Sequence, residues 1–121
     1  VRQALGPSED TCANSCRGDP GFIQRHMFPG GHCPALSEVL RTGARAGLTV
    51  DGVFDMREHY ARTLRMWDEA FMAKSAQVRA LEGFDERFVR MFHYYFCYCE
   101  TGFLRRNVYV HQLRMRKPHS A

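Results

Sequence analysis

The sequence lacks several features that would assign a protein class at once. Among its 121 residues, no apolar run approaches the ~20 residues that a membrane-spanning helix needs. The start of the chain, Val1–Pro7, has no apolar core of a signal peptide. There is also no glycine-rich phosphate loop and no G-x-S-x-G motif. We therefore expect a cytoplasmic protein without a dinucleotide fingerprint or a serine nucleophile.

The five cysteines are an odd number. Together with the missing secretory signal, this favours free thiols over a disulfide framework. Cys12, Cys16, His32 and Cys33 are the candidates for a zinc site. Their spacing forms no regular zinc motif, and adjacent His and Cys ligands fit a tetrahedral ion poorly. We expect no metal in this chain.

The net charge of +4 is modest, and much of the excess lies late in the chain. The late basic residues are Arg105, Arg106, Arg114, Arg116 and Lys117. They would favour peripheral contact with an anionic membrane surface, here the inner face, but a solvated helix end and tail is the simpler explanation. Aromatic residues interleave with basic ones in the segment 87–98, but they fall mostly on the buried stripe of a helix, so we expect no nucleic acid partner.

The pattern of apolar residues predicts about four helices and a pair of strands, after an irregular start that is rich in Gly, Pro, Ser and Asp. The helices are expected at 22–27, 36–44, 55–71 and from about 84 to 105, and the strands at 48–54, with a bulge or bend near Gly52, and at 108–113. The tail from Arg114 is polar. Gly47 is placed to end the second helix, whereas Ala35 offers no side-chain cap for its start. Since two strands alone make a marginal sheet, this is an α/β chain with an incomplete sheet.

The two long helices each have an aromatic face. The helix at 55–71 has the stripe Tyr60, Leu64, Trp67 and Phe71. The last helix has the face Phe88, Phe92, Tyr95, Phe96, Cys99 and Phe103.

Cys97 stands roughly 200° around the last helix from Cys99, and therefore points outward or toward another element. Cys99 is then a small buried hydrophobe, with nothing nearby to make it a nucleophile. The packing pattern does not decide whether the Tyr60 hydroxyl bonds to a structural partner or points toward a reacting centre.

Five separated segments resemble the C-terminal part of the cyclopropane fatty acid synthase and mycolic acid cyclopropane synthase family, which are S-adenosylmethionine-dependent methyltransferases acting on lipid acyl chains. The segments occur in one order along most of the chain. They are FIQRHMFPGG (22–31), AGLTV (46–50), HYARTL (59–64), FDERFVRM (84–91) and YCETGF (98–103). The resemblance divides the chain into a non-matching segment 1–17, a methyltransferase part 18–117 and a tail 118–121.

The resemblance implies the seven-stranded fold of class I methyltransferases, whose last two strands correspond to the pair predicted here. In that family the donor site precedes this region, so the chain is expected to be a fragment without a cofactor site of its own. The implied reaction adds the methyl group of S-adenosylmethionine to a double bond of an unsaturated phospholipid or other acyl chain. A base then removes a proton and a ring closes. The sequence does not distinguish a cyclopropane product from a methyl-branched or methoxy product.

The resemblance also implies roles for six residues. A bicarbonate ion is the implied base, and by position its ligands here are Tyr60 and Cys99. The acyl chain would contact Phe28, Leu64, Tyr95 and Phe103. We therefore expect the acyl-binding part of a cyclopropane-fatty-acyl-phospholipid synthase-like methyltransferase that is inactive alone. The alternative is a stand-alone helical interaction module that kept this fold without the reaction.

Overall fold

A computed structural model describes residues 2–7, 21–29, 31 and 33–118. The chain divides into two compact units, one formed by Val1–Arg57 with Arg106–Ala121 and the other by Glu58–Arg105. The first unit contains a sheet and two short helical elements, and the second contains helices only. Each unit is described separately.

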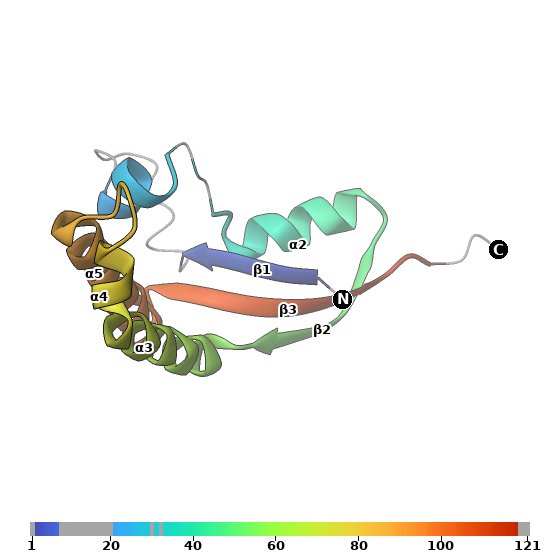
Figure 1. Ribbon diagram of the computed structural model, residues 1–121. Helices are drawn as coiled ribbons and strands as arrows, with labels where there is room; N and C mark the ends of the chain where they lie inside the picture. Colours follow the sequence, from blue (N-terminus) through green and yellow to red (C-terminus); the bar gives the residue numbers. More distant parts are fainter. Residues whose placement is uncertain (1, 8–20, 30, 32, 119–121) are drawn as a thin grey trace. The chain divides into compact units, whose positions relative to one another are not determined.

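The sheet of the first unit has three antiparallel-paired strands in the order β1-β3-β2 (Figure 1). Its strands are β1 (Arg2–Pro7), β2 (Thr49–Asp55) and β3 (Val108–Arg116). The central strand β3 holds the buried residues Val110 and Leu113, each 1% exposed. Because neighbouring residues of a strand point to opposite faces, these two side chains are buried on opposite sides of β3. The sheet is therefore covered on both faces at its centre.

Strand β1 corrects the prediction for the start of the chain. Residues 2–7 were expected to be irregular, yet they pair with β3 in a regular register from Arg2↔Leu113 to Pro7↔Val108. Within Arg2–Pro7 only Ala4 and Leu5 are apolar, so no alternation marks the strand. Backbone hydrogen bonds to β3 define it instead. The sheet therefore has three strands, one more than the sequence predicted. The other residues of segment 1–17 lie outside the described residues.

Strand β2 contains the predicted bulge. The pairing with β3 shifts between Val50, opposite Met115, and Gly52, opposite Arg114. The extra residue, Asp51, accepts a hydrogen bond of 3.0 Å from Arg116 and lies 4.0 Å from the Arg114 guanidinium. Both arginines belong to β3. The strand therefore continues to Arg116, whereas the sequence predicted that it ends at residue 113 and that a polar tail begins at Arg114. The Asp51 carboxylate of the bulge therefore forms ion pairs with both of these arginines.

Helix α2 (Leu36–Arg45) joins the short π-helix η1 (Ile23–Met27) to the sheet. It begins at Ala35 without a side-chain cap and is followed by Gly47 at φ +73°, as predicted. A left-handed backbone conformation at this position suits glycine, which has no Cβ to clash. Gly43 is buried, and a Cβ there would lie 3.6 Å from the Met115 methyl group on β3. This is an ordinary van der Waals distance, so α2 packs against β3 with Gly43 at the contact.

The second unit consists of α3 (Arg57–Ala73), α4 (Ser75–Arg79) and α5 (Glu86–Leu104), with α3 starting at the boundary residue Arg57. The Asp85 side chain accepts a hydrogen bond of 2.9 Å from the Phe88 N–H and caps α5. Phe71 on α3 lies 5.8 Å, centroid to centroid, from both Phe92 and Phe96 on α5. These contacts confirm the predicted aromatic face of α5. The short helix α4 was not predicted.

The stripe predicted for α3 is wrong at Trp67, whose side chain is 54% exposed. The buried residues of α3 are Ala61 and Leu64, and Asp68 and Phe71 contact α5. The contact face is therefore rotated slightly from the predicted one. Periodicity alone does not resolve neighbouring apolar stripes on one helix. In the part of the chain that the structure describes, no helix is long and apolar enough to cross a membrane.

Candidate functional site

Five of the six predicted site residues lie on two helices of the second unit. Tyr60 and Leu64 come from α3, and Tyr95, Cys99 and Phe103 come from α5. The sixth, Phe28, belongs to the other unit, where it follows η1 and is 56% exposed. The structure thus groups five of the candidates on two helices of one unit, and the sixth belongs to the other unit.

The rings of Tyr60 and Phe103 form the aromatic contact within this group. Their centroids are 5.8 Å apart and the planes are tilted by 50°. Leu64, one helical turn after Tyr60, is 4% exposed, and Phe103 is 6% exposed. Tyr60 is only half-buried. A tilted aromatic pair beside a buried leucine makes an apolar surface with one polar group, the Tyr60 hydroxyl.

Cys99 and Tyr95 interact one turn apart on α5. The Tyr95 hydroxyl donates a hydrogen bond to the Cys99 sulfur. Burial raises the pKa of the Cys99 thiol to about 11. Burial, then the nearby Cys99, also raises the pKa of Tyr95. At neutral pH the thiol therefore stays protonated, which excludes a thiolate nucleophile and leaves the S–H able to donate a hydrogen bond.

Arg65 and Glu100 were missed from the sequence although they flank this site. The Arg65 Nε donates a hydrogen bond of 2.8 Å to the Glu100 carboxylate, joining α3 to α5 next to Cys99. Glu100 is the only acidic residue of α5 after the first turn, and its side chain is 17% exposed. A single acidic residue near the end of an otherwise aromatic helix was the sequence feature that could have indicated an ion-pair partner on another helix.

Two of the predicted residues carry groups that can donate a hydrogen bond to a small anion. These groups are the Tyr60 hydroxyl and the Cys99 thiol, whose raised pKa keeps its proton on the sulfur at neutral pH. The described residues include no glycine-rich loop after a strand. Of the zinc candidates, Cys12, Cys16 and His32 lie outside the described residues, and Cys33 is exposed.

The described part of the first unit has a separate open hollow on its sheet, with a volume of about 250 Å³. Its lining comes from the bulged end of β2 and the facing part of β3. The lining residues are Gly52, Val53, Phe54, Gln112 and Arg114. None of the predicted site residues is among them.

Strand β3 is antiparallel to both of its neighbours, and helices precede and separate the strands, as in an α/β fold. A solved structure of mycolic acid cyclopropane synthase CmaA1, complexed with SAH and CTAB, matches this chain with a TM-score of 0.82 and 27% identity. The match covers 95% of this chain and 42% of that one. The expected fold is therefore confirmed for the part that the chain spans.

Sequence comparison gives the family. The model for mycolic acid cyclopropane synthetase matches residues 3–113. Tuberculostearic acid methyltransferase UfaA1 of Mycobacterium tuberculosis is 42% identical over 83 residues, covering 68% of this chain and 19% of the relative. A probable fatty acid methyltransferase of Pseudomonas putida is 34% identical over 104 residues, covering 86% of this chain and 26% of the relative. The chain belongs to the mycolic acid cyclopropane synthetase family, and the matches span 19% and 26% of the length of these two relatives.

The family match corrects one boundary. Residues 3–17 were predicted to lie outside the resemblance, yet the matched segment starts at residue 3. Strand β1 explains the difference, because its pairing with β3 makes residues 2–7 part of the same sheet. Its few apolar residues gave no motif by which to recognise it.

Proposed function

We propose that this chain is the acyl-binding and anion-binding part of an S-adenosylmethionine-dependent lipid methyltransferase of the cyclopropane-fatty-acyl-phospholipid synthase type. The substrate is an unsaturated phospholipid or related acyl chain. One observation carries the proposal: α3 and α5 hold the Tyr60–Phe103 ring pair, while α5 holds the protonated Cys99 thiol. An apolar aromatic surface and neutral anion donors on two packed helices are what this chemistry requires.

The aromatic residues have a role in charge stabilisation. Methylation of a double bond leaves positive charge on the acyl chain. The faces of Tyr60 and Phe103 attract such a charge through the ring quadrupole, most strongly where water is excluded. The burial of Leu64 and Phe103 supports a water-poor environment. These side chains would orient the acyl chain and protect the charged carbon from water.

The polar donors have a role in proton removal. Bicarbonate, when bound, would supply the base. The Tyr60 hydroxyl and the Cys99 S–H would hold this anion by donating hydrogen bonds, and Tyr95 fixes the sulfur by donating to it. The raised Cys99 pKa keeps the donor proton in place at neutral pH, so the residue binds without taking part as a nucleophile.

The proposed donor site lies in another part of the complete enzyme, so this chain alone is inactive. Calorimetric titration of the purified chain with S-adenosylmethionine tests this point. We expect no binding at micromolar concentrations. Saturable binding in that range would show that the chain has its own donor site.

Acyl binding is tested with labelled oleate as the probe, in equilibrium binding to the full chain. Leu64→Phe enlarges a buried side chain beside the Tyr60–Phe103 pair and should weaken binding about 10-fold, the order of change for a one-group mismatch in an apolar pocket. Met66→Phe is the matched control, because Met66 is 58% exposed. Far-ultraviolet circular dichroism checks that both variants fold. A chain that binds no oleate would favour the non-catalytic interaction module.

Peripheral contact with an anionic membrane is part of the proposal. Arg105 and Arg106 are exposed and follow Leu104, which is 56% exposed. An apolar side chain next to two cations suits the boundary between headgroups and acyl chains. In a cell the chain would then lie at the inner membrane face. Arg105→Gln with Arg106→Gln should reduce sedimentation with phosphatidylglycerol vesicles, whereas Arg41→Gln with Arg62→Gln should not.

A further inference from the structure

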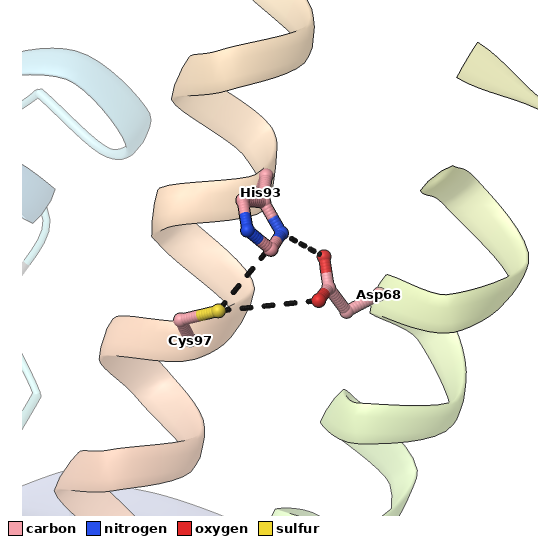
Figure 2. A group of neighbouring side chains, drawn as sticks. All are labelled: Asp68, His93 and Cys97. Atoms are coloured by element: carbon pink, nitrogen blue, oxygen red, sulfur yellow. Dashed lines mark hydrogen bonds and ion pairs between the residues drawn. The ribbon is translucent and has the colours of Figure 1, made fainter. Parts of the chain in front are cut away.

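Three side chains with different donor atoms meet between α3 and α5, on residues that the proposed function does not use. Figure 2 shows Asp68 from α3 facing His93 and Cys97 from α5. The His93 Nδ1 lies 2.7 Å from Asp68 Oδ1, and the Cys97 sulfur lies 3.9 Å from both Asp68 Oδ2 and His93 Nδ1. All three ligand atoms lie within 4.8 Å of one another.

The arrangement does not suit a cysteine nucleophile. In a Cys-His-Asp triad the carboxylate and the thiol contact different ring nitrogens, so that the imidazole can relay a proton. Here both Asp68 and Cys97 approach the same nitrogen of His93. Burial, then the charges of Asp68 and Glu100, raises the pKa of Cys97. The cluster therefore lacks both the proton relay and an activated thiolate.

The same geometry suits a metal ion. In a tetrahedral zinc site with bonds of about 2.0–2.3 Å, neighbouring ligand atoms are about 3.3–3.8 Å apart. The two distances from Cys97 are slightly longer than this, and the Asp68–His93 distance is shorter. Rotation of exposed side chains can make changes of this size, and His93 and Cys97 are both exposed. His93 and Cys97 are four residues apart on α5, so they project from the same helix face.

We propose that Asp68, His93 and Cys97 bind a divalent transition metal ion of the zinc type. Oxygen, nitrogen and sulfur donors together favour zinc over calcium or magnesium, which prefer oxygen alone. Three protein ligands leave a fourth position for water or another ligand. Glu100 does not occupy it, because its carboxylate accepts the hydrogen bond from Arg65. The metal would join α3 to α5 independently of the proposed lipid chemistry.

Cobalt is the probe for the test, because thiolate coordination to Co²⁺ gives a charge-transfer absorption that other ligands do not. The full chain, reduced and freed of metal by a chelator, is titrated with Co²⁺ and then with Zn²⁺. We expect the band to appear and to disappear as Zn²⁺ displaces Co²⁺. Cys97→Ser should abolish the band. His93→Gln should weaken Co²⁺ binding at least ~10-fold, because even indirect disturbance of a metal site has an effect of this size.

A chain with Cys12, Cys16 and Cys33 all replaced by Ser is the matched control and should keep the band. Zn²⁺ should also raise the thermal midpoint of this control and of the unaltered chain, but not that of Cys97→Ser, since a ligand stabilises only a state that binds it. The absence of a thiolate band in the unaltered chain would overturn the proposal. A band that survives in Cys97→Ser and is lost in the control would overturn it too, by assigning the metal to the early cysteines.

Discussion

The Tyr95 hydroxyl donates a hydrogen bond to the Cys99 sulfur one turn further along α5, and burial raises the pKa of that thiol to about 11. Cys99 is therefore held as a neutral donor by its surroundings. The neighbouring contact between Tyr60 and Phe103, at 5.8 Å between centroids, provides the apolar part of the same site. These two helices therefore carry a hydrogen-bond donor that suits an anion and a pair of rings that suits an apolar chain.

Cys99 should react slowly with alkylating reagents. A pKa about two units above that of an ordinary thiol lowers the thiolate fraction about 100-fold. Iodoacetamide at pH 8 should therefore modify Cys99 at least that much more slowly in the folded chain than in urea, as followed by mass spectrometry of its peptide. Cys33, which is exposed, should show little difference between the two conditions. Equal rates for folded and unfolded Cys99 would refute the raised pKa.

The free energy of unfolding should fall as pH rises from about 9 to about 11. The ordinary thiol pKa is 9.0 and that of folded Cys99 is about 11. The unfolded state therefore loses its proton first and is favoured throughout this range, while the stabilisation is complete below pH 9. Screening of a half-buried group reduces the Cys99 contribution to about 1 kcal/mol. Urea unfolding of Cys99→Ser should show a smaller decline over the same range, and an identical decline would assign the effect elsewhere.

The Arg65–Glu100 ion pair should contribute measurably to the packing of α3 on α5. The Glu100 side chain is 17% exposed and that of Arg65 is 63% exposed. Glu100→Gln should lower the free energy of unfolding by about 1 kcal/mol, as expected for a charge-assisted hydrogen bond with one half-buried partner. The exposed pair Glu38–Arg41 on α2 is the control. Glu38→Gln should change the free energy of unfolding by less than about 0.5 kcal/mol. A double-mutant cycle with Arg65→Gln that shows no coupling would contradict this account.

Gly47 should tolerate alanine poorly. Its φ of +73° lies in the left-handed region, where a Cβ costs about 1 kcal/mol. Gly47→Ala should lower the free energy of unfolding by that amount in urea titrations. Gly21→Ala is the control, since Gly21 has no positive φ and open space around its Cα. Equal stability of the two variants would show that Gly47 does not set the end of α2.

Local signals in the sequence were sufficient to predict the end of α2, the approximate start of α5 and the bulge in β2. Asp85 and Gly47 act within a few residues of their own position, so their roles do not depend on distant contacts. Strand β1 and the exposure of Trp67 depend instead on what packs against each element. The meeting of Asp68 with His93 likewise depends on the rotation of α3 relative to α5, which periodicity does not determine. Tyr60 and Cys99 were singled out by family resemblance, because their residue types alone fit ordinary packing.

The measurement closest to the central claim is methyl transfer by a chimera, in which this chain replaces the matching segment of the tuberculostearic acid methyltransferase UfaA1. We expect the chimera to transfer labelled methyl groups from S-adenosylmethionine to lipid, while this chain alone does not. Tyr60→Phe should lower turnover at least ~10-fold through loss of one donor at the reacting centre. Tyr98→Phe, at a side chain that is 49% exposed, should leave turnover nearly unchanged. A chimera that binds S-adenosylmethionine but turns over equally fast with Phe at position 60 would contradict the assignment of this site.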